Sequence, residues 1–302
     1  MSESRSTQDN RRTASRHRKR LGVMFGVVTV FMLAEAAAGL LTNSLALLSD
    51  AGHMATDALG LGMALAAIIA ADRAKSGDHR TFGLYRIEIL AALANAILLL
   101  VVAGYVLYES VARFRNPPDV LTGPMLAVAV VGLGVNLLGF WLLREGSGTS
   151  INLEGAFLEV LADLWGSIGV IAAALTMILT GWQYADPLFG AAIGLFILPR
   201  AIRLGSKSLR ILVQAAPARL DLGEIERDLA DIGGVGDVHD LHVWTLTSEM
   251  DVASVHLMIR EGSDSHLILD EATRLLRDEH GIAHATLQVE PETHAECQEM
   301  TW

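Results

Sequence analysis

Residues 44–71 read SLALLSDAGHMATDALGLGMALAAIIAA, a long and mainly apolar run. A helix needs about 20 mainly apolar residues to cross a bilayer, and this run is long enough. Yet it carries His53 and Asp57 near its middle, with Asp50 one turn earlier. Each ionisable side chain at bilayer depth costs free energy, so such residues mark functional positions by default. The stretch therefore predicts a transmembrane helix with polar side chains turned into a protein interior.

The same apolar character extends over most of the chain. Of its 302 residues, 52% are hydrophobic and only 19% are charged, whereas soluble proteins have about 25% charged residues. Mean hydropathy is +0.40. Six stretches are long and apolar enough to span a membrane: 21–41, 44–71, 87–112, 122–143, 155–180 and 186–204. We expect an all-α bundle of six transmembrane helices.

The pattern changes after the last apolar stretch. An amphipathic segment ends at Gly233 and Gly234, and two alternating segments, VHDLHVWTLT and DVASVHLMIR, look like paired strands. A second helix follows, with Asp264 as its N-cap and Gly281 as its stop, and then a last strand. The order helix–strand–strand–helix–strand predicts a small α+β domain.

These patterns divide the chain into four parts. We expect a basic tail, a six-span transmembrane domain, a small α+β domain and a C-terminal tail, over residues 1–20, 21–214, 215–292 and 293–302.

Charge is distributed unevenly along these parts. The first part carries seven Lys and Arg against two acidic residues. Residues 215–302 carry five against nineteen, together with seven of the ten histidines. Nucleic acid binds to a basic face, so the acidic C-terminal end argues against nucleic acid as a partner. An acidic surface is compatible with cations as partners.

Basic residues also indicate orientation. They concentrate in the N-terminal tail, the 72–86 loop and the segment after residue 204, which fall on one side of a six-span bundle. The positive-inside rule then predicts a multi-pass protein of the cell membrane with both termini in the cytosol. The single cysteine, Cys297, excludes a disulfide framework within the chain.

Two spans carry matching pairs of ionisable residues. His53 and Asp57 lie four residues apart and share a helix face, and Glu159 and Asp163 repeat this spacing on the fifth span. We expect no Lys or Arg inside the spans to neutralise either pair. Two such helices can surround one metal ion with four nitrogen and oxygen ligands, an arrangement that suits zinc. The alternative is that each acid is protonated and hydrogen-bonded within the bundle.

Three further polar residues, Glu35, Asp50 and Asn136, lie at membrane depth near these pairs. We expect them to support the site. The alternative for Glu35 and Asn136 is hydrogen bonding between helices, which also occurs in membrane bundles.

A mechanism follows from the ligand chemistry. A metal binds the deprotonated forms of its ligands, so binding releases protons. No GxxxxGK[ST] loop for ATP is present. We therefore expect a secondary antiporter that exchanges a divalent cation for protons, with no organic cofactor. An enzyme is not expected, because no nucleophile accompanies the pairs. A channel or uptake carrier, and a metal sensor with a membrane anchor, remain as alternatives.

The chain after residue 20 resembles the cation diffusion facilitator family of divalent-metal exporters. The stretches that carry the resemblance are SLALLSDAGHMATD, RTFGLYRIEILAAL, VNLLGFWLL, DPLFGAAIGLFIL and VHDLHVWTLTS. The resemblance implies a six-span bundle followed by a cytosolic ferredoxin-like domain. It also implies a homodimer that exchanges metal for protons by alternating access.

Three of the four paired residues match the family's transport site, namely His53, Asp57 and Asp163. Glu159 does not match, since family members that move zinc usually have histidine there. Carboxylate favours harder ions such as Mn²⁺, whereas imidazole favours Zn²⁺, Co²⁺ and Ni²⁺. We expect Zn²⁺, with Cd²⁺, Co²⁺ or Ni²⁺ as further substrates. The alternative is Mn²⁺ or Fe²⁺ as the main substrate.

The resemblance also implies a regulatory metal site in the last domain, formed by His239, His256, His266 and Glu290. Some relatives have another histidine where this chain has Gln288, so this site is expected to be depleted. Strand alternation predicts that His242, three residues from His239, lies on the other face of the sheet. For each histidine alone, an ordinary surface role is the alternative.

Two weaker candidates complete the set. Asp72, Asp78 and His79 in the 72–86 loop form a candidate accessory site, with ordinary solvation as the alternative. His294 and Cys297 offer ligand atoms in the C-terminal tail, without a fixed framework.

Overall fold

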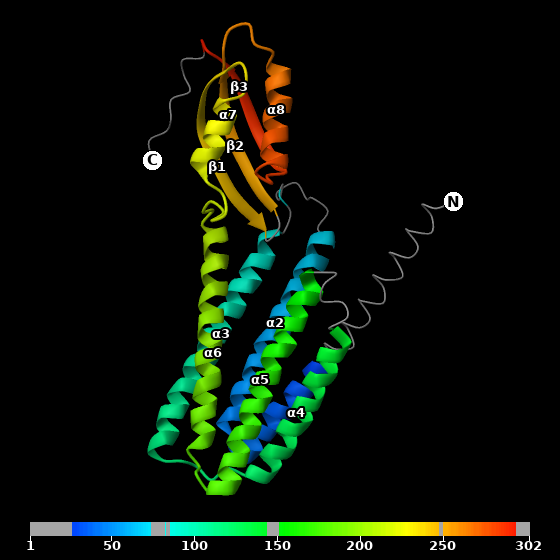
Figure 1. Ribbon diagram of the computed structural model, residues 1–302, viewed down its shortest axis with the longest axis vertical. Helices are drawn as coiled ribbons and strands as arrows, with labels where there is room; N and C mark the ends of the chain where they lie inside the picture. The colour runs from blue at the N-terminus through cyan, green and yellow to red at the C-terminus, as the bar shows by residue number, and fades with distance from the viewer. Residues whose placement is uncertain (1–25, 74–81, 83–84, 144–150, 248–249, 294–302) are drawn as a thin grey trace, which may run out of the picture. The chain divides into compact units, whose positions relative to one another are not determined.

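The computed structural model describes residues 26–73, 82, 85–143, 151–247 and 250–293 (Figure 1). The chain divides into two compact units. One consists of the residues up to 62 together with 94–203, and the other of residues 63–93 together with those from 204 onward. Several helices continue from one unit into the other.

Within the described residues, six helices form the apolar part of the chain. They are Gly26–Thr42, α2 Leu45–Arg73, α3 Tyr85–Arg115, α4 Thr122–Leu143, α5 Ile151–Thr180 and α6 Ala185–Leu212. Among the described residues, α3, α4, α5 and α6 contain segments long and apolar enough to cross a membrane. The expected spans therefore correspond to helices. The sixth helix, however, extends eight residues beyond the expected end at residue 204.

Small side chains let these helices pack closely. The core shared by α2, α4, α5 and α6 contains Ala46, Ala129, Ala173, Ala174 and Ala185, all nearly without exposed surface. Large apolar side chains point outward instead, such as Leu179, which is 81% exposed. Small side chains inside and large apolar side chains outside are expected where lipid surrounds the protein. Small residues let the helix backbones approach one another, and large apolar side chains contact the lipid tails.

The C-terminal domain has the expected order of elements. Its elements are α7 Leu222–Ala230, β1 Val235–Thr247, β2 Met250–Ile259, α8 Ser265–Asp278 and β3 His284–Pro291. The sheet order is β1-β2-β3, with β1 and β2 antiparallel and β2 and β3 parallel. Asp264 caps α8 as predicted, accepting hydrogen bonds from the backbone N–H groups of His266 and Leu267. Gly281 follows this helix with a φ of +70°.

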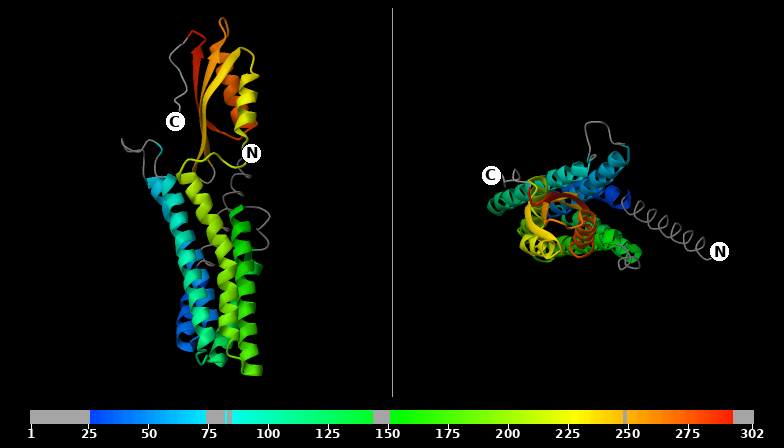
Figure 2. Two further views of the ribbon diagram at one scale, coloured as in Figure 1. Left: turned by 90° about the vertical axis from the view of Figure 1, so that its left-hand side faces the viewer. Right: turned by 90° about the horizontal axis from the view of Figure 1, so that it is seen from above.

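Both helices of this domain cover the same face of the sheet (Figure 2). Ala253, Val255 and Leu257 alternate along β2 and are completely buried with Ile225 of α7 and Leu276 of α8. The intervening residues of β2, including His256, therefore belong to the opposite face. This α+β layer leaves one face of the sheet free of its own helices.

An irregularity in β1 overturns the prediction for His242. His239 lies opposite His256, but His242 lies opposite Ser254, so three steps on β1 match two on β2. Asp240, within this β-bulge, has a φ of +50°. Because opposite residues share a face, the extra residue returns His242 to the same face as His239. Simple alternation failed here because the bulge shifts the register by one residue.

Candidate functional site

Asp186, at the start of α6, holds the first turn of α2. Its carboxylate accepts hydrogen bonds from the Ser44 hydroxyl at 2.7 Å and from the backbone N–H groups of Leu45 and Ala46 at 2.7 and 3.1 Å. The Arg113 guanidinium of α3 lies 3.5 Å from the same carboxylate. Asp186 is completely buried. A negative charge stabilises a helix N-terminus, so this residue fixes where α2 begins.

Helices α2 and α5 approach each other closely one turn before the first ligand pair. A Cβ atom built on Gly166 of α5 would lie 2.4 Å from Asp50 Oδ1 of α2. One helical turn further along α2, His53 Nε2 lies 3.8 Å from Asp163 Oδ1. The two helices run in opposite directions, so each step forward on α2 matches a step back on α5.

This register also places the other two predicted ligands at one level. Asp57 follows His53 by four residues, and Glu159 precedes Asp163 by four. One further turn along both helices therefore brings residues 57 and 159 opposite each other. The side chains of Asp57 and Glu159 lie outside the described residues. Their roles as ligands stay predictions that the backbone register supports.

His53 and Asp163 themselves have suitable geometry for one ion. Both are buried, with 4% and 6% of their surface exposed. Two atoms bound tetrahedrally to one zinc ion lie about 3.4 Å apart, given metal–ligand distances near 2.1 Å. The observed 3.8 Å between nitrogen and oxygen is close to this separation. A small movement of the two side chains toward each other would bring both atoms to the separation that one zinc ion requires.

The three supporting residues are all buried at this depth. Glu35 and Asp50 each have 1% exposed surface and Asn136 has 2%. Asn136 of α4 donates a hydrogen bond from Nδ2 to Ser167 Oγ of α5 at 3.0 Å. Glu35 lies close enough to Asp50 and Asp163 for their charges to interact. Asn136 therefore forms a hydrogen bond between helices, and the two acids lie close to each other beside the candidate site.

One expectation is wrong: the spans do contain a basic residue close to this site. Arg200 lies inside α6, half-buried, and its charge acts on the His53 ring. Arg200 lies near the end of the expected sixth span, 186–204, but three more basic residues follow it within ten positions and made it resemble the start of a cytosolic flank. In the structure α6 continues through these residues to Leu212.

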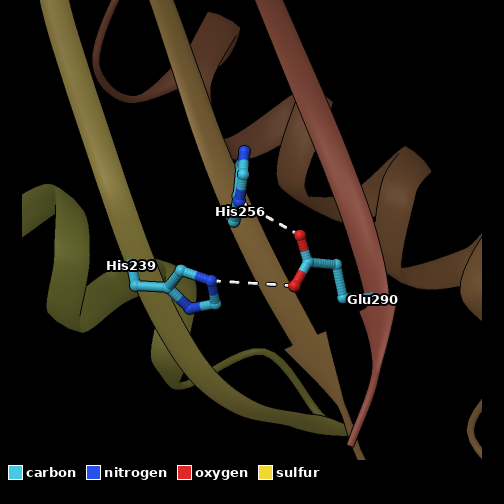
Figure 3. Close-up of side chains that lie close together, drawn as sticks. All are labelled: His239, His256 and Glu290. Carbon is cyan, nitrogen blue, oxygen red and sulfur yellow. Dashed lines mark ion pairs between the residues drawn. The ribbon is translucent and has the colours of Figure 1, made fainter. Parts of the chain in front are cut away.

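The C-terminal domain gathers a second group of ligand atoms on its open face (Figure 3). His239 of β1, His256 of β2 and Glu290 of β3 offer ligand atoms within 4.8 Å of one another. His256 Nδ1 lies 3.0 Å from Glu290 Oε1, and His239 Nε2 lies 3.7 Å from Glu290 Oε2. These separations bracket the value of about 3.4 Å for two ligands of one tetrahedral ion.

Two neighbours of this cluster affect how it can bind. Gln288 donates a hydrogen bond from Nε2 to Glu290 Oε1 at 2.6 Å, so an amide fills the place next to the carboxylate. Asp237 Oδ2 lies 3.3 Å from His239 Nδ1 and can orient that ring. Sequence reasoning missed Asp237, although its spacing of two residues from His239 on a strand indicates a shared face.

His266 does not belong to this group. It is exposed in the first turn of α8, and its backbone N–H binds the capping Asp264. Since both helices cover the face opposite to the cluster, the start of α8 does not bring its side chain to the other three. The ligand set that the structure brings together within the described domain is therefore His239, His256 and Glu290.

Some predicted residues cannot be placed. Asp78, His79, His294 and Cys297 lie outside the described residues, and so does the side chain of Asp72.

The arrangement defines a class of protein: a multi-pass membrane protein with polar residues buried between its helices and an α+β domain after them. Residues 21–213 match the family model described as the cation efflux transmembrane domain. Residues 217–292 match the model of the cation efflux protein cytoplasmic domain. The chain belongs to the cation efflux family, the cation diffusion facilitators that its motifs resemble.

Curated relatives match over most of their length. The chain is 40% identical to the cadmium, cobalt and zinc/H(+)-K(+) antiporter of Bacillus subtilis (strain 168), over 92% of this chain and 90% of the relative. It is 42% identical to the metal cation efflux system protein CzcD of Cupriavidus metallidurans, over 89% of this chain and 85% of the relative. It is 43% identical to the zinc transporter ZitB of Escherichia coli (strain K12), over 90% and 87%.

A solved structure, the metal-bound C-terminal domain of the CzcD transporter, is 35% identical. It covers 24% of this chain and 99% of its own, with a TM-score of 0.23.

Proposed function

We propose that this protein exports divalent transition-metal cations from the cytosol in exchange for protons. The observation that carries the proposal is the register of α2 and α5, in which His53 lies 3.8 Å from Asp163 and the positions of Asp57 and Glu159 face each other one turn further along. One imidazole and three carboxylates form the site. Relatives named for zinc, cadmium and cobalt support this substrate class.

Proton exchange follows from the same ligands. Metal binding requires neutral imidazole and ionised carboxylates, so an ion entering the site displaces protons. Buried charge is costly in the bilayer, and either a divalent ion or protons would reduce that cost. A site that opens alternately to the two sides would then couple the two flows in opposite directions.

Zn²⁺ is the main substrate in this proposal, with Cd²⁺, Co²⁺ or Ni²⁺ also carried. The observation that favours Mn²⁺ or Fe²⁺ instead is the carboxylate at Glu159, where imidazole would favour the softer ions. The functional form is a homodimer in the cell membrane with both termini in the cytosol. It acts as a carrier without an enzymatic step or an organic cofactor.

The cluster of His239, His256 and Glu290 is proposed to bind a regulatory divalent metal. Two imidazole nitrogens and a carboxylate suit Zn²⁺, and a water molecule or a residue of a second copy could complete four ligands. The three residues of the cluster lie on three different strands, so a bound ion would link β1, β2 and β3.

The transport proposal is tested by flux into proteoliposomes under a pH gradient. Zn²⁺, Cd²⁺, Co²⁺, Ni²⁺, Fe²⁺ and Mn²⁺ are supplied one at a time, with a pH-sensitive dye on the opposite side. We expect metal-dependent proton flux that is lost in Asp57→Ala and in Glu159→Ala. Glu159→His should keep zinc and lose some other metal.

The exposed loop residue Asp119 supplies the matched control, since Asp119→Ala also removes one carboxylate. Metal flux that does not depend on the pH gradient would contradict the antiport mechanism. Unchanged transport in Glu159→Ala would remove this residue from the site.

A further inference from the structure

Arg200 occupies a defined level in the bundle, which follows from how α6 is joined to α2. Leu45 N donates to Asp186 Oδ2, and one turn later Ser49 Oγ donates to the Gly190 carbonyl oxygen at 3.4 Å. Both contacts join residues 141 positions apart, so the two helices run side by side in the same direction and in register. With this offset, Arg200 lies level with residue 59.

The side chain of Arg200 extends back from that level toward the predicted ligands. Side chains in a helix point toward its N-terminus, over the preceding turn. A long arginine at the level of residue 59 therefore reaches the level of Asp57. The register and the partial burial of Arg200 together place its guanidinium at the level of the transport site.

The surroundings of Arg200 also differ from those of its neighbour on the helix. Arg200 is half-buried, and Ile197 and Ala201 on either side of it are buried in the bundle. Arg203, one turn on, is exposed and bonds from Nε to the Pro199 carbonyl oxygen of its own helix. Arginine inside a membrane segment is costly and normally pairs with acidic groups of the protein interior.

The formal charge of the site explains why a cation would belong there. Asp57, Glu159 and Asp163 together carry −3 when ionised, and His53 is neutral when it binds metal. Sites with two carboxylates and two imidazoles carry −2, which a divalent ion balances. With glutamate in the second pair, one extra negative charge remains at membrane depth even when an ion is bound.

We infer that Arg200 is the built-in counter-charge of the transport site, balancing the third carboxylate so that a divalent ion leaves the loaded site neutral. This inference rests on the proposed function. It assigns Arg200 a role in setting how tightly the site holds its ion, and it links that role to Glu159. An ion must bind well enough to enter and weakly enough to leave, so excess negative charge would slow release.

The test measures Zn²⁺ flux in proteoliposomes and separates KM from kcat. In Arg200→Gln the uncompensated carboxylate should lower KM by about tenfold and lower kcat by a similar factor, because the ion is held more tightly. Arg200→Lys keeps the charge and should stay within about threefold of the wild type in both constants. Arg203→Gln removes an equal charge from the exposed side of the same helix and should change neither.

The double variant Glu159→His/Arg200→Gln provides the decisive arm. It restores a site charge of −2 by a different route, so its KM and kcat should return toward the wild-type values. Recovery of kcat in the double variant would also show that the lower kcat of Arg200→Gln does not come from misfolding. Unchanged or raised KM in Arg200→Gln, or a double variant as impaired as the single one, would overturn the inference.

Absence of any wild-type metal flux would contradict the proposed function. Wild-type flux together with an Arg200→Gln protein that matches it would contradict the counter-charge alone.

Discussion

Asp50 of α2 lies directly against the backbone of Gly166 in α5, where an added Cβ atom would come within 2.4 Å of its Oδ1 atom. This contact occurs one turn from the pair His53 and Asp163, whose atoms are 3.8 Å apart. The closeness of the two helices at one level therefore sets the ligand distance at the next. A side chain at position 166 would require the Asp50 carboxylate or the helix backbone to move.

Gly166→Ala should consequently impair transport. The methyl group must displace Asp50 or separate the two helices, and a misplacement of about 1 Å can reduce a rate by about a hundredfold. We expect initial Zn²⁺ flux in proteoliposomes to fall at least about tenfold. Gly169→Ala on the same helix is the control, because its Cβ atom would meet only Phe189 Cδ1 at an ordinary 3.6 Å. Equal flux in both variants would show that the close approach does not position the site.

Asp186→Ala should destabilise the bundle. The substitution removes the acceptor for the Ser44 hydroxyl and two backbone N–H groups, and takes a partner from Arg113. Removing one member of such a buried charged group costs about 3 kcal/mol. We expect a clearly lower melting temperature of the detergent-solubilised protein, with Asp186→Asn intermediate because it keeps one oxygen acceptor.

The exposed Asp119 again serves as the comparison for this measurement. Asp119→Ala should leave the melting temperature nearly unchanged, since surface substitutions stay within about 0.5 kcal/mol. A similar melting temperature for Asp186→Ala and Asp119→Ala would mean that the buried carboxylate does not hold α2 in place.

The transmembrane helices could be predicted from the sequence because lipid imposes a long apolar run on each of them. The matching pairs on α2 and α5 were visible for a similar reason, since spacing within one helix fixes which residues share a face. The cap of α8 by Asp264 was also readable, because its partners lie two and three residues away. All these features depend on short distances along the chain.

What escaped prediction depends on contacts between distant segments. Asp186 caps a helix that begins 141 residues earlier, and no local pattern reveals such a partner. Arg200, near the end of the expected sixth span, was grouped with the basic residues that follow it, although α6 continues through them to Leu212. The bulge at Asp240 changed the face of His242 because one extra residue reverses the alternation that simple strands follow.

His256→Ala should remove a bound metal from the C-terminal domain. Its Nδ1 atom lies 3.0 Å from Glu290 Oε1, and the remaining two side chains cannot fill a tetrahedral site. We expect the purified full-length protein, dialysed against low Zn²⁺, to lose about one zinc ion per chain by elemental analysis. His266→Ala, which alters an exposed histidine of the same domain, should keep the wild-type zinc content. Loss of zinc in His266→Ala and not in His256→Ala would contradict the assigned cluster.

Gln288→His should strengthen the same cluster. Gln288 lies opposite His256 in the sheet and occupies Glu290 Oε1 through a hydrogen bond of 2.6 Å. An imidazole there adds a fourth ligand and releases the carboxylate oxygen, so we expect zinc affinity of the cluster to rise about tenfold or more. Competition with a chromogenic chelator, in an Asp57→Ala background that disables the transport site, measures this affinity. Gln288→Ala releases the oxygen without adding a ligand and should raise affinity less. Equal affinities for the alanine and histidine variants would show that position 288 lies too far from the ion to coordinate it.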